Sequence, residues 1–168
     1  PQSPSARGVA ICQADLLPGG DPDLDRIRSL TGPSTRLVHI QKSRGYDSRR
    51  ALLNRDIRAI TETVRSANPN AIIFVDHCYS EFVEEEEPLA FGADLLAGSL
   101  IKNPGAGIAP GGGYVAGRAD LVWQVSEAMT AVGVGRHVGP SYGLTRLMLE
   151  GLYFAPTVVA AAMKDWAL

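Results

Sequence analysis

Residues 71–117 read AIIFVDHCYSEFVEEEEPLAFGADLLAGSLIKNPGAGIAPGGGYVAG and carry the pattern that decides the expected fold. An apolar run at 71–75 ends in Asp76, and a second run at 94–101 ends in Lys102. Short apolar runs without polar alternation are typical of strands buried on both faces of a parallel sheet. Ligands bind beyond the carboxyl ends of such strands, so we expect Asp76 and Lys102 where a ligand would meet them.

A carboxylate and an amine at the ends of neighbouring strands suit a pyridoxal phosphate site. The amine of Lys102 would form a Schiff base with the cofactor aldehyde, and Asp76 would pair with the protonated pyridine nitrogen. Tyr79 would hydrogen-bond the phenolic oxygen of the ring. Ser99 would bind the phosphate, beside free N–H groups of the glycine-rich loop that begins at Gly105. The alternative is a pair without a ligand, because strand-end Asp and Lys residues are common and short motifs have low specificity.

A family resemblance adds to this interpretation. The order D-x-x-Y followed by S-x-x-K-N resembles the fold-type-I pyridoxal phosphate enzymes, the aspartate aminotransferase superfamily. Longer strings, including IQKSRGY, FVDHCYSEFVEEEEP and VGRHVGPSYGLTRLMLEGLYFAP, resemble the methionine gamma-lyase-like family that is often labelled aluminium resistance protein. The similarity runs from about residue 16 to residue 164. The positions that match the motif are Asp76, Tyr79, Ser99 and Lys102.

The resemblance implies a lyase that cleaves carbon–sulfur bonds in a sulfur-containing amino acid, in the cytoplasm, as a homodimer or homotetramer. Lys102 would also abstract the substrate α-proton, with its pKa lowered by apolar surroundings and the cationic ring. Two departures from the family pattern stand out: His77, where Asn is expected, and Ser80, where Gly is expected. Ala106 and Gly111 also stand where Gly and Thr are expected. Because His77 would lie beside the cofactor ring, the reaction specificity stays open. The alternative function is a truncated, non-catalytic remnant that serves as a binding or interaction module.

The loop after a strand expected at 35–41 would lie on the ligand side of the sheet. It reads KSRGY and contains Ser43 and Arg44. Ser43 would contact the cofactor, and Arg44 would bind the substrate carboxylate, since Arg pairs with carboxylates bidentately. A solvated basic loop without such contacts is an equal alternative.

The expected architecture is a three-layer α/β/α arrangement with a mostly parallel sheet. The chain has 168 residues, enough for one domain, whereas enzymes of the resembled superfamily are considerably longer. We therefore expect residues 1–142 to be part of the large pyridoxal-phosphate-binding domain of the fold-type-I enzymes. Residues 143–168 would form a long helix toward a small domain that the chain lacks, so that the chain would be a fragment.

Hydrophobic periodicity and turn residues predict the remaining elements. Strands are expected at 8–13 and, in antiparallel orientation, at 113–117; helices are expected at 23–30 with Asp21 as N-cap, at 53–67, and at 120–129. A helix at 143–164 is apolar all round and must be buried against another subunit or the missing domain. The acidic run 84–87 is expected to be a solvated stretch rather than a metal site.

Composition narrows the class of protein. The net charge is −2 and 20% of residues are charged, so nothing suggests a nucleic-acid or anionic-membrane partner. No apolar run in the sequence is expected to be long enough for a membrane span. Cys12 and Cys78 are too few for a disulfide framework, and neither lies in a metal-ligand pattern. We therefore expect no metal, and a reducing cytoplasm.

Overall fold

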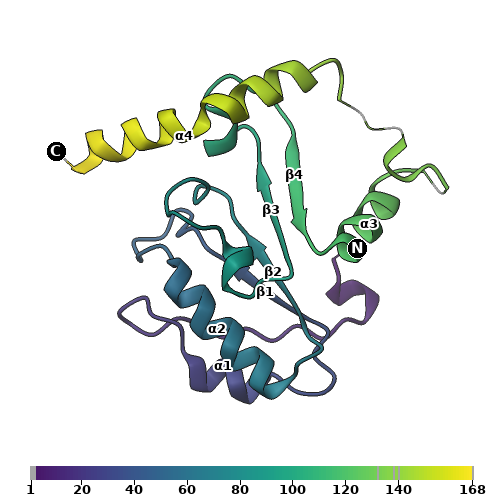
Figure 1. The fold of residues 1–168 in the computed structure, drawn as a ribbon. Helices are drawn as coiled ribbons and strands as arrows, with labels where there is room; N and C mark the ends of the chain where they lie inside the picture. The colour runs from purple at the N-terminus through teal and green to yellow at the C-terminus, as the bar shows by residue number, and fades with distance from the viewer. Residues whose placement is uncertain (1–2, 132, 138, 140, 168) are drawn as a thin grey trace.

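The computed structural model describes residues 3–131, 133–137, 139 and 141–167. Its centre is a sheet with the strand order β1-β2-β3-β4 (Figure 1). The first three strands are mutually parallel and the fourth is antiparallel to the third. The strands are β1 (Leu37–Gln41), β2 (Ile72–Asp76), β3 (Leu95–Ser99) and β4 (Gly113–Gly117). This mostly parallel sheet with its helices confirms the expected α/β class, including the antiparallel orientation at 113–117.

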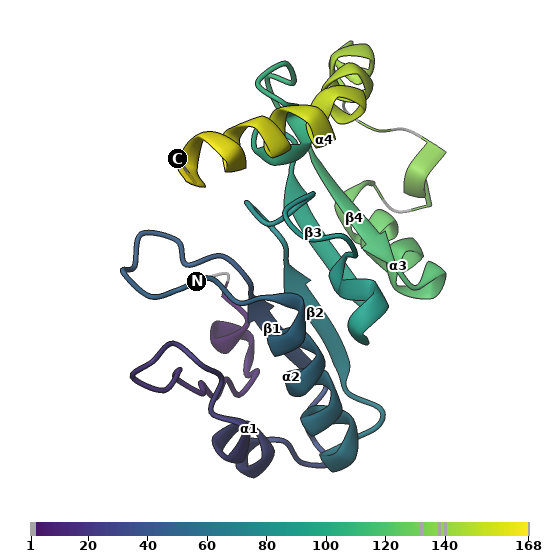
Figure 2. The same ribbon diagram turned by 60° about the vertical axis from the view of Figure 1, so that its left-hand side comes forward.

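The core lies between the sheet and two helices, α1 (Leu24–Leu30) and α2 (Asn54–Ala67). Figures 1 and 2 show α1 and α2 side by side along the β1–β2 half of the sheet. In β2 the side chains alternate, so that Ile73 and Val75 are fully buried while their neighbours are half-buried. Ile57 of α2 belongs to the same buried cluster. Each fully buried Ile or Val side chain contributes about 1.5–3 kcal/mol to stability.

The opposite face of β1 and β2 is open to solvent in the described chain. His39 and Phe74 stack there with their ring centroids 5.1 Å apart. His39 and Leu37 are exposed, and Phe74 is half-buried. Over β1, therefore, this chain supplies one helical layer. The helix α3 (Ala119–Met129) follows β4 and contacts it.

Two expectations near the N-terminus are wrong. Residues 8–13 form no strand, and the exposed side chains there include Val9 and Ile11. A strand needs a partner for its backbone groups, and no described segment pairs with these residues. The N-cap of α1 is Asp23, whose Oδ1 accepts a hydrogen bond from the Arg26 amide at 2.8 Å. Asp21 instead pairs with Arg50 at 2.5 Å.

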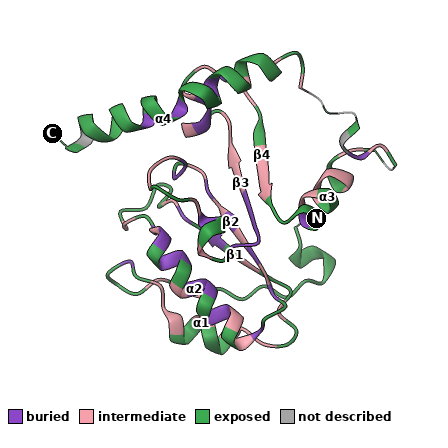
Figure 3. Ribbon diagram, viewed as in Figure 1, coloured by how far each residue is buried: buried purple, intermediate pink, exposed green. Residues whose placement is uncertain are grey.

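The last helix, α4 (Thr145–Ala167), packs on the 3-10 helix η3 (Asn103–Gly105) that follows β3. Gly105 and Gly151 meet so closely that a Cβ on Gly151 would overlap the Gly105 backbone. Most residues of α4 are nevertheless exposed, as Figure 3 shows, and they include most of its apolar residues. The division of the chain at residues 142 and 143 stays a prediction.

One sequence judgement on α4 needs correction. By length and composition Thr145–Asp165 is apolar enough to cross a membrane, with a mean hydropathy of 1.2, whereas we expected no run of that length. The close contact at Gly151 shows that this helix also packs on the sheet domain. A single helix of this kind is weak evidence for a membrane span, because core helices of soluble proteins share its composition.

Candidate active site

Three of the predicted residues meet at the carboxyl end of the sheet. Asp76 is the last residue of β2, and Lys102 follows the end of β3 by three positions. The Lys102 Nζ lies 4.4 Å from the centroid of the Tyr79 ring, a cation–π distance. Cys78 is a neighbour of both charged groups: burial and then Asp76 raise the pKa of its thiol, whereas Lys102 lowers it. The structure therefore brings together the carboxylate, the amine and the phenol that the spacing predicted, with the Cys78 thiol as a further neighbour.

A tight turn after β2 sets this arrangement. The Cys78 amide donates to the Asp76 Oδ1 at 3.1 Å, which is an Asx-type turn, and the Ser80 amide donates to the His77 carbonyl at 3.0 Å. Tyr79 has a φ of +65°, in the left-handed region that non-glycine residues rarely adopt. Its ring is 59% exposed. Strained backbone of this kind is frequent at functional sites.

The electrostatics of Lys102 differ from the expectation. Its partial burial acts to lower its pKa, but the neighbouring Cys78, Tyr79 and Asp76 outweigh burial and raise the pKa above its ordinary value. The expected lowering of the Lys102 pKa depended partly on the cationic ring of a bound cofactor. The three protein neighbours instead favour the charged form of the amine. The pKa of the Cys78 thiol is raised as well, chiefly by burial and then by Asp76.

The predicted phosphate ligands are less complete. Ser99 is half-buried, and its Oγ accepts a hydrogen bond from the Ile101 amide at 3.4 Å. The Gly105 amide already donates to the Lys102 carbonyl at 3.0 Å. Gly105 therefore lacks the free N–H that we predicted for phosphate binding. A Cβ at this position would overlap the Leu100 carbonyl oxygen, so the glycine is required for the tight turn.

The predicted residues of the loop after β1 form no hydrogen bond or ion pair with this cluster in the described part of the chain. Arg44 is exposed, and Ser43 is half-buried, with its carbonyl oxygen accepting from Arg49 at 2.6 Å. Within the described part of the chain, no hydrogen bond or ion pair joins Ser43 or Arg44 to Asp76 or Lys102. The loop is at the ligand edge of the sheet, but contact of these two residues with a ligand stays a prediction.

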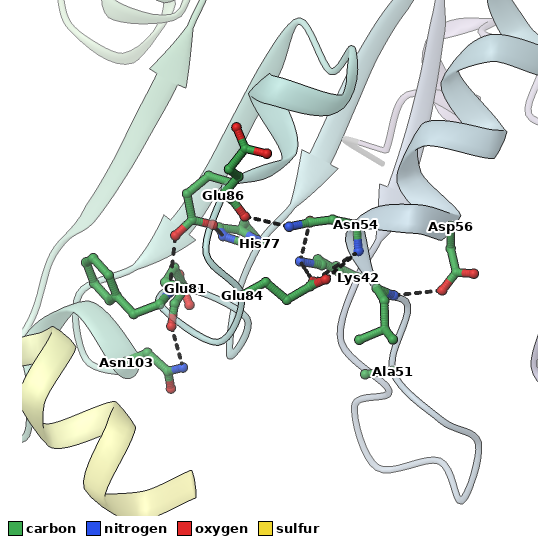
Figure 4. Close-up of polar contacts among 12 residues, drawn as sticks. Lys42, Ala51, Asn54, Asp56, His77, Glu81, Glu84, Glu86 and Asn103 are labelled. Atoms are coloured by element: carbon green, nitrogen blue, oxygen red, sulfur yellow. Dashed lines mark hydrogen bonds and ion pairs between the residues drawn. The ribbon is translucent and has the colours of Figure 1, made fainter.

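Sequence reasoning missed a group of buried polar residues close to the site (Figure 4). Lys42 is 1% exposed, and its Nζ lies 2.8 Å from the Glu84 Oε2, so the loop is not simply a solvated basic one. His77 is 1% exposed and its Nε2 pairs with Glu87. The acidic run therefore has a structural role in part: Glu84 and Glu87 are half-buried and paired, which the expectation of a solvated stretch did not include.

The described residues fit the ring end of pyridoxal phosphate better than its phosphate end. The half-buried amine of Lys102, the carboxylate of Asp76 and the exposed Tyr79 ring would suit the aldehyde, the ring nitrogen and the phenolic oxygen. For the phosphate, the predicted residue with a suitable donor is Ser99 alone. Among the described residues, no cluster of three or more His, Cys, Asp or Glu side chains could hold a metal ion.

Comparisons with known proteins agree with the expected family. A sequence model of the methionine gamma-lyase family matches residues 3–168. The chain is 44% identical over 150 residues to the uncharacterised protein YnbB of Bacillus subtilis, covering 89% of this chain and 36% of YnbB.

Solved structures extend the similarity to the fold. A Listeria monocytogenes protein, provisionally named a cystathionine beta-lyase involved in aluminium resistance, is 41% identical with a TM-score of 0.91; the match covers 98% of this chain and 41% of that one. A carbon–sulfur lyase involved in aluminium resistance from Clostridium novyi is 44% identical with a TM-score of 0.85, covering 91% and 36%. The chain therefore spans less than half of each of these relatives.

A more distant structure supports the fold alone. An aspartate aminotransferase from Thermus thermophilus is 17% identical with a TM-score of 0.64, and the match covers 93% of this chain and 45% of that one. The four-stranded sheet and its helices thus correspond to part of the fold-type-I architecture.

Proposed function

This chain belongs to the methionine gamma-lyase family, and from that premise we propose that it carries the catalytic core of a pyridoxal-phosphate-dependent carbon–sulfur lyase. The substrate would be a sulfur-containing amino acid. The observation that supports this proposal most is the meeting of the Lys102 amine, the Asp76 carboxylate and the Tyr79 ring at the carboxyl end of the sheet. The relatives named as lyases are full-length proteins, so the activity is proposed for the full-length protein.

Each side chain would have a distinct role in this reaction. When bound, pyridoxal phosphate supplies an electron sink for negative charge at the substrate α-carbon. Lys102 would hold the cofactor covalently and later move the α-proton of the substrate. Asp76 would keep a proton on the ring nitrogen, because a carboxylate beside that nitrogen favours its charged form. Tyr79 would hydrogen-bond the phenolic oxygen, and Ser99 the phosphate.

The pKa of Lys102 bears on the order of events. A raised pKa leaves the amine mostly protonated at neutral pH, and a protonated amine is neither a nucleophile nor a base. Loss of that proton is therefore required before the cofactor binds covalently. The neighbouring Cys78 and Asp76 are the groups that hold the proton on the amine.

We further propose that Ser43 and Arg44 face the bound cofactor and substrate, and that the protein works in the cytoplasm as a homo-oligomer.

The proposal is tested by finding which lysine the cofactor modifies. Pyridoxal phosphate added to the full-length protein, followed by borohydride reduction and peptide mapping, should label Lys102. Lys102→Ala should remove the label and abolish lyase turnover, whereas Lys164→Ala, on the exposed side of α4, should change neither. Asp76→Ala should lower turnover by orders of magnitude.

Two outcomes would contradict the assignment. A label on Lys42 or Lys164 in place of Lys102 would overturn the proposed site. A full-length protein that takes up no cofactor at all would favour the non-catalytic binding module.

A further inference from the structure

The backbone pairing of the sheet continues for one more residue after β1 and after β2, which adds a row to the sheet. The side chains of these two residues lie on the face opposite to that of Asp76. The Lys42 amide donates to the Asp76 carbonyl at 3.1 Å and the His77 amide to the Ala97 carbonyl at 2.9 Å, which extends the parallel ladders. Because side chains alternate between the two faces, this next row points to the face that α2 covers. The register makes its members Lys42, His77, Gly98 and Tyr114.

Each side chain in this row is paired with a glutamate from one short segment, residues 81–87, which we call the acidic brace. The pairs are Tyr114 Oη to Glu81 Oε1 at 2.9 Å, Lys42 Nζ to Glu84 Oε2 at 2.8 Å, and His77 Nε2 to Glu87 Oε2. The fourth member of the row is Gly98, where a Cβ would overlap both Glu81 and Tyr114. The acidic brace thus crosses the ends of all four strands.

Further bonds tie the acidic brace to the elements around the candidate site. Within the acidic brace itself, which begins two residues after Tyr79, the Glu87 Oε1 accepts from the Phe82 amide at 3.1 Å. Glu84 accepts from the Asn54 amide at 3.0 Å, at the N-terminus of α2, where a carboxylate is favoured. The Asn103 side chain donates to the Glu81 carbonyl at 3.0 Å, and Asn103 directly follows Lys102 (Figure 4).

We infer that Glu81, Glu84 and Glu87 are positioning residues, which hold the turn after Asp76 and the segment around Lys102 in register with one another. The acidic brace lies behind the site, contacts both segments that form it, and needs no ligand to do so. This inference rests on the proposed function for the role of Lys102, but not for the bonds themselves. Glu85 and Glu86, in the same run, have exposed side chains and do not belong to the positioning set.

The three glutamates differ in what a Gln substitution would disturb. Glu84→Gln removes the negative charge beside the ammonium of Lys42, which is almost fully buried, and an unpaired buried charge is costly. Glu87 accepts from the Phe82 amide with Oε1 and pairs with the His77 Nε2 through Oε2, so Glu87→Gln removes the negative charge that strengthens both contacts. Glu81 has one oxygen, Oε2, without a partner among the described residues, so Glu81→Gln can keep the bond to Tyr114. We expect Glu81→Gln to be the mildest.

Amide hydrogen exchange on the full-length protein without added cofactor reports the acidic brace directly. Glu87→Gln should raise the exchange rate of the Phe82 amide about tenfold, because its hydrogen bond then has a neutral acceptor in place of a charged one. Glu84→Gln should do the same for the Asn54 amide. The matched control is Glu85→Gln, which removes an exposed charge from the same run and should leave both rates unchanged.

Positioning of Lys102 is read from competitive acetylation of the amines, with the exposed Lys164 as the internal reference. In Glu87→Gln and in Asn103→Ala, release of Lys102 from its neighbours should raise the Lys102-to-Lys164 labelling ratio severalfold. Asn103→Ala cuts the link without removing a buried charge, so it remains informative if Glu84→Gln does not fold. The conservative double variant His77→Asn with Glu87→Gln, an amide pair, should restore part of the wild-type ratio.

An unchanged labelling ratio beside faster Phe82 exchange would overturn the inference, since the acidic brace would then support the fold without positioning Lys102. Equal effects of Glu85→Gln and Glu87→Gln would also overturn it. Failure of the proposed function looks different: wild-type protein would take up no cofactor on Lys102, while the exchange and acetylation changes persisted.

Discussion

At the scale of single residues, Cys78 offers the sharpest chemical test. Its pKa is raised by burial and by the neighbouring Asp76, so less thiolate is present near pH 8 and the thiol should react slowly. In iodoacetamide alkylation followed by mass spectrometry, Cys78 should be modified severalfold more slowly than the exposed Cys12 of the same molecule. Asp76→Asn should speed the reaction of Cys78, because it removes a charge that opposes the thiolate.

Equal rates for the two cysteines in folded protein would contradict the arrangement of the site. A urea-unfolded sample is the control, since both thiols are then exposed and their rates should converge. Asp120→Asn serves as the matched variant, because Asp120 lies on α3 with its partner Arg118 and touches neither cysteine.

The site residues that the sequence predicted correctly as neighbours are those at strand ends. Asp76 and Lys102 each close an apolar run, and strand ends of a parallel sheet meet at one edge whatever the details of packing. Lys42 could not be placed in the same way, because its burial depends on Glu84, a partner 42 positions away in the sequence. The alternation of side chains along a strand was the available clue. Lys42 lies two residues after the buried Ile40, so its side chain lies on the same face as Ile40.

At the scale of elements, the N-terminus of α2 gives a prediction on pH. Burial acts to raise the pKa of Asp56, but its bonds from Arg50 and from the Leu53 amide outweigh burial and lower the pKa below the ordinary value. A carboxyl group with a lowered folded-state pKa stabilises the fold above its unfolded pKa of about 3.9 and loses that contribution as the pH falls through the folded value.

The free energy of unfolding in urea should therefore decrease as the pH falls below about 4. Asp56→Asn should lower stability at pH 7 by about 1 kcal/mol, as expected for a lost helix-terminal bond, and should flatten the dependence below pH 4. Asp25→Asn is the control, because Asp25 is exposed in the first turn of α1. Parallel pH curves for wild type and Asp56→Asn would contradict the role of this carboxylate.

Helices and strands were predicted best where the apolar positions in their sequence are also the positions that pack on the core. The helix expected at 53–67 is observed at Asn54–Ala67, because its apolar positions share one face with the buried side chains of β2. Residues 8–13 have the composition of a strand but no partner strand among the described residues, and a strand forms only by pairing. Local composition therefore identified elements whose partners lie in this chain.

At the scale of the whole molecule, apolar side chains are exposed on two elements of the described chain. One is the outer face of β1, where Leu37 is exposed. The other is α4, whose exposed apolar residues are Leu147, Leu149, Leu152, Tyr153, Phe154, Val158 and Met163. Several large apolar side chains exposed on one helix usually mark an interface or an aggregation risk. The expectation that α4 requires cover from outside the described fold agrees with this exposure, although the identity of that cover stays a prediction.

The 168 residues prepared alone should therefore self-associate. In sedimentation velocity we expect species larger than a monomer whose share grows with protein concentration, because association removes apolar surface from water and an open sheet edge adds unpaired backbone groups. The double variant Leu149→Gln with Tyr153→Gln should reduce the association, since both side chains are exposed on α4 and Leu149 is 62% exposed. Val9→Gln, an exposed apolar position far from α4 in sequence, is the control and should leave it unchanged. A concentration-independent monomer that unfolds cooperatively would show that α4 is stable in water without a partner, and the exposed face would then be an ordinary surface.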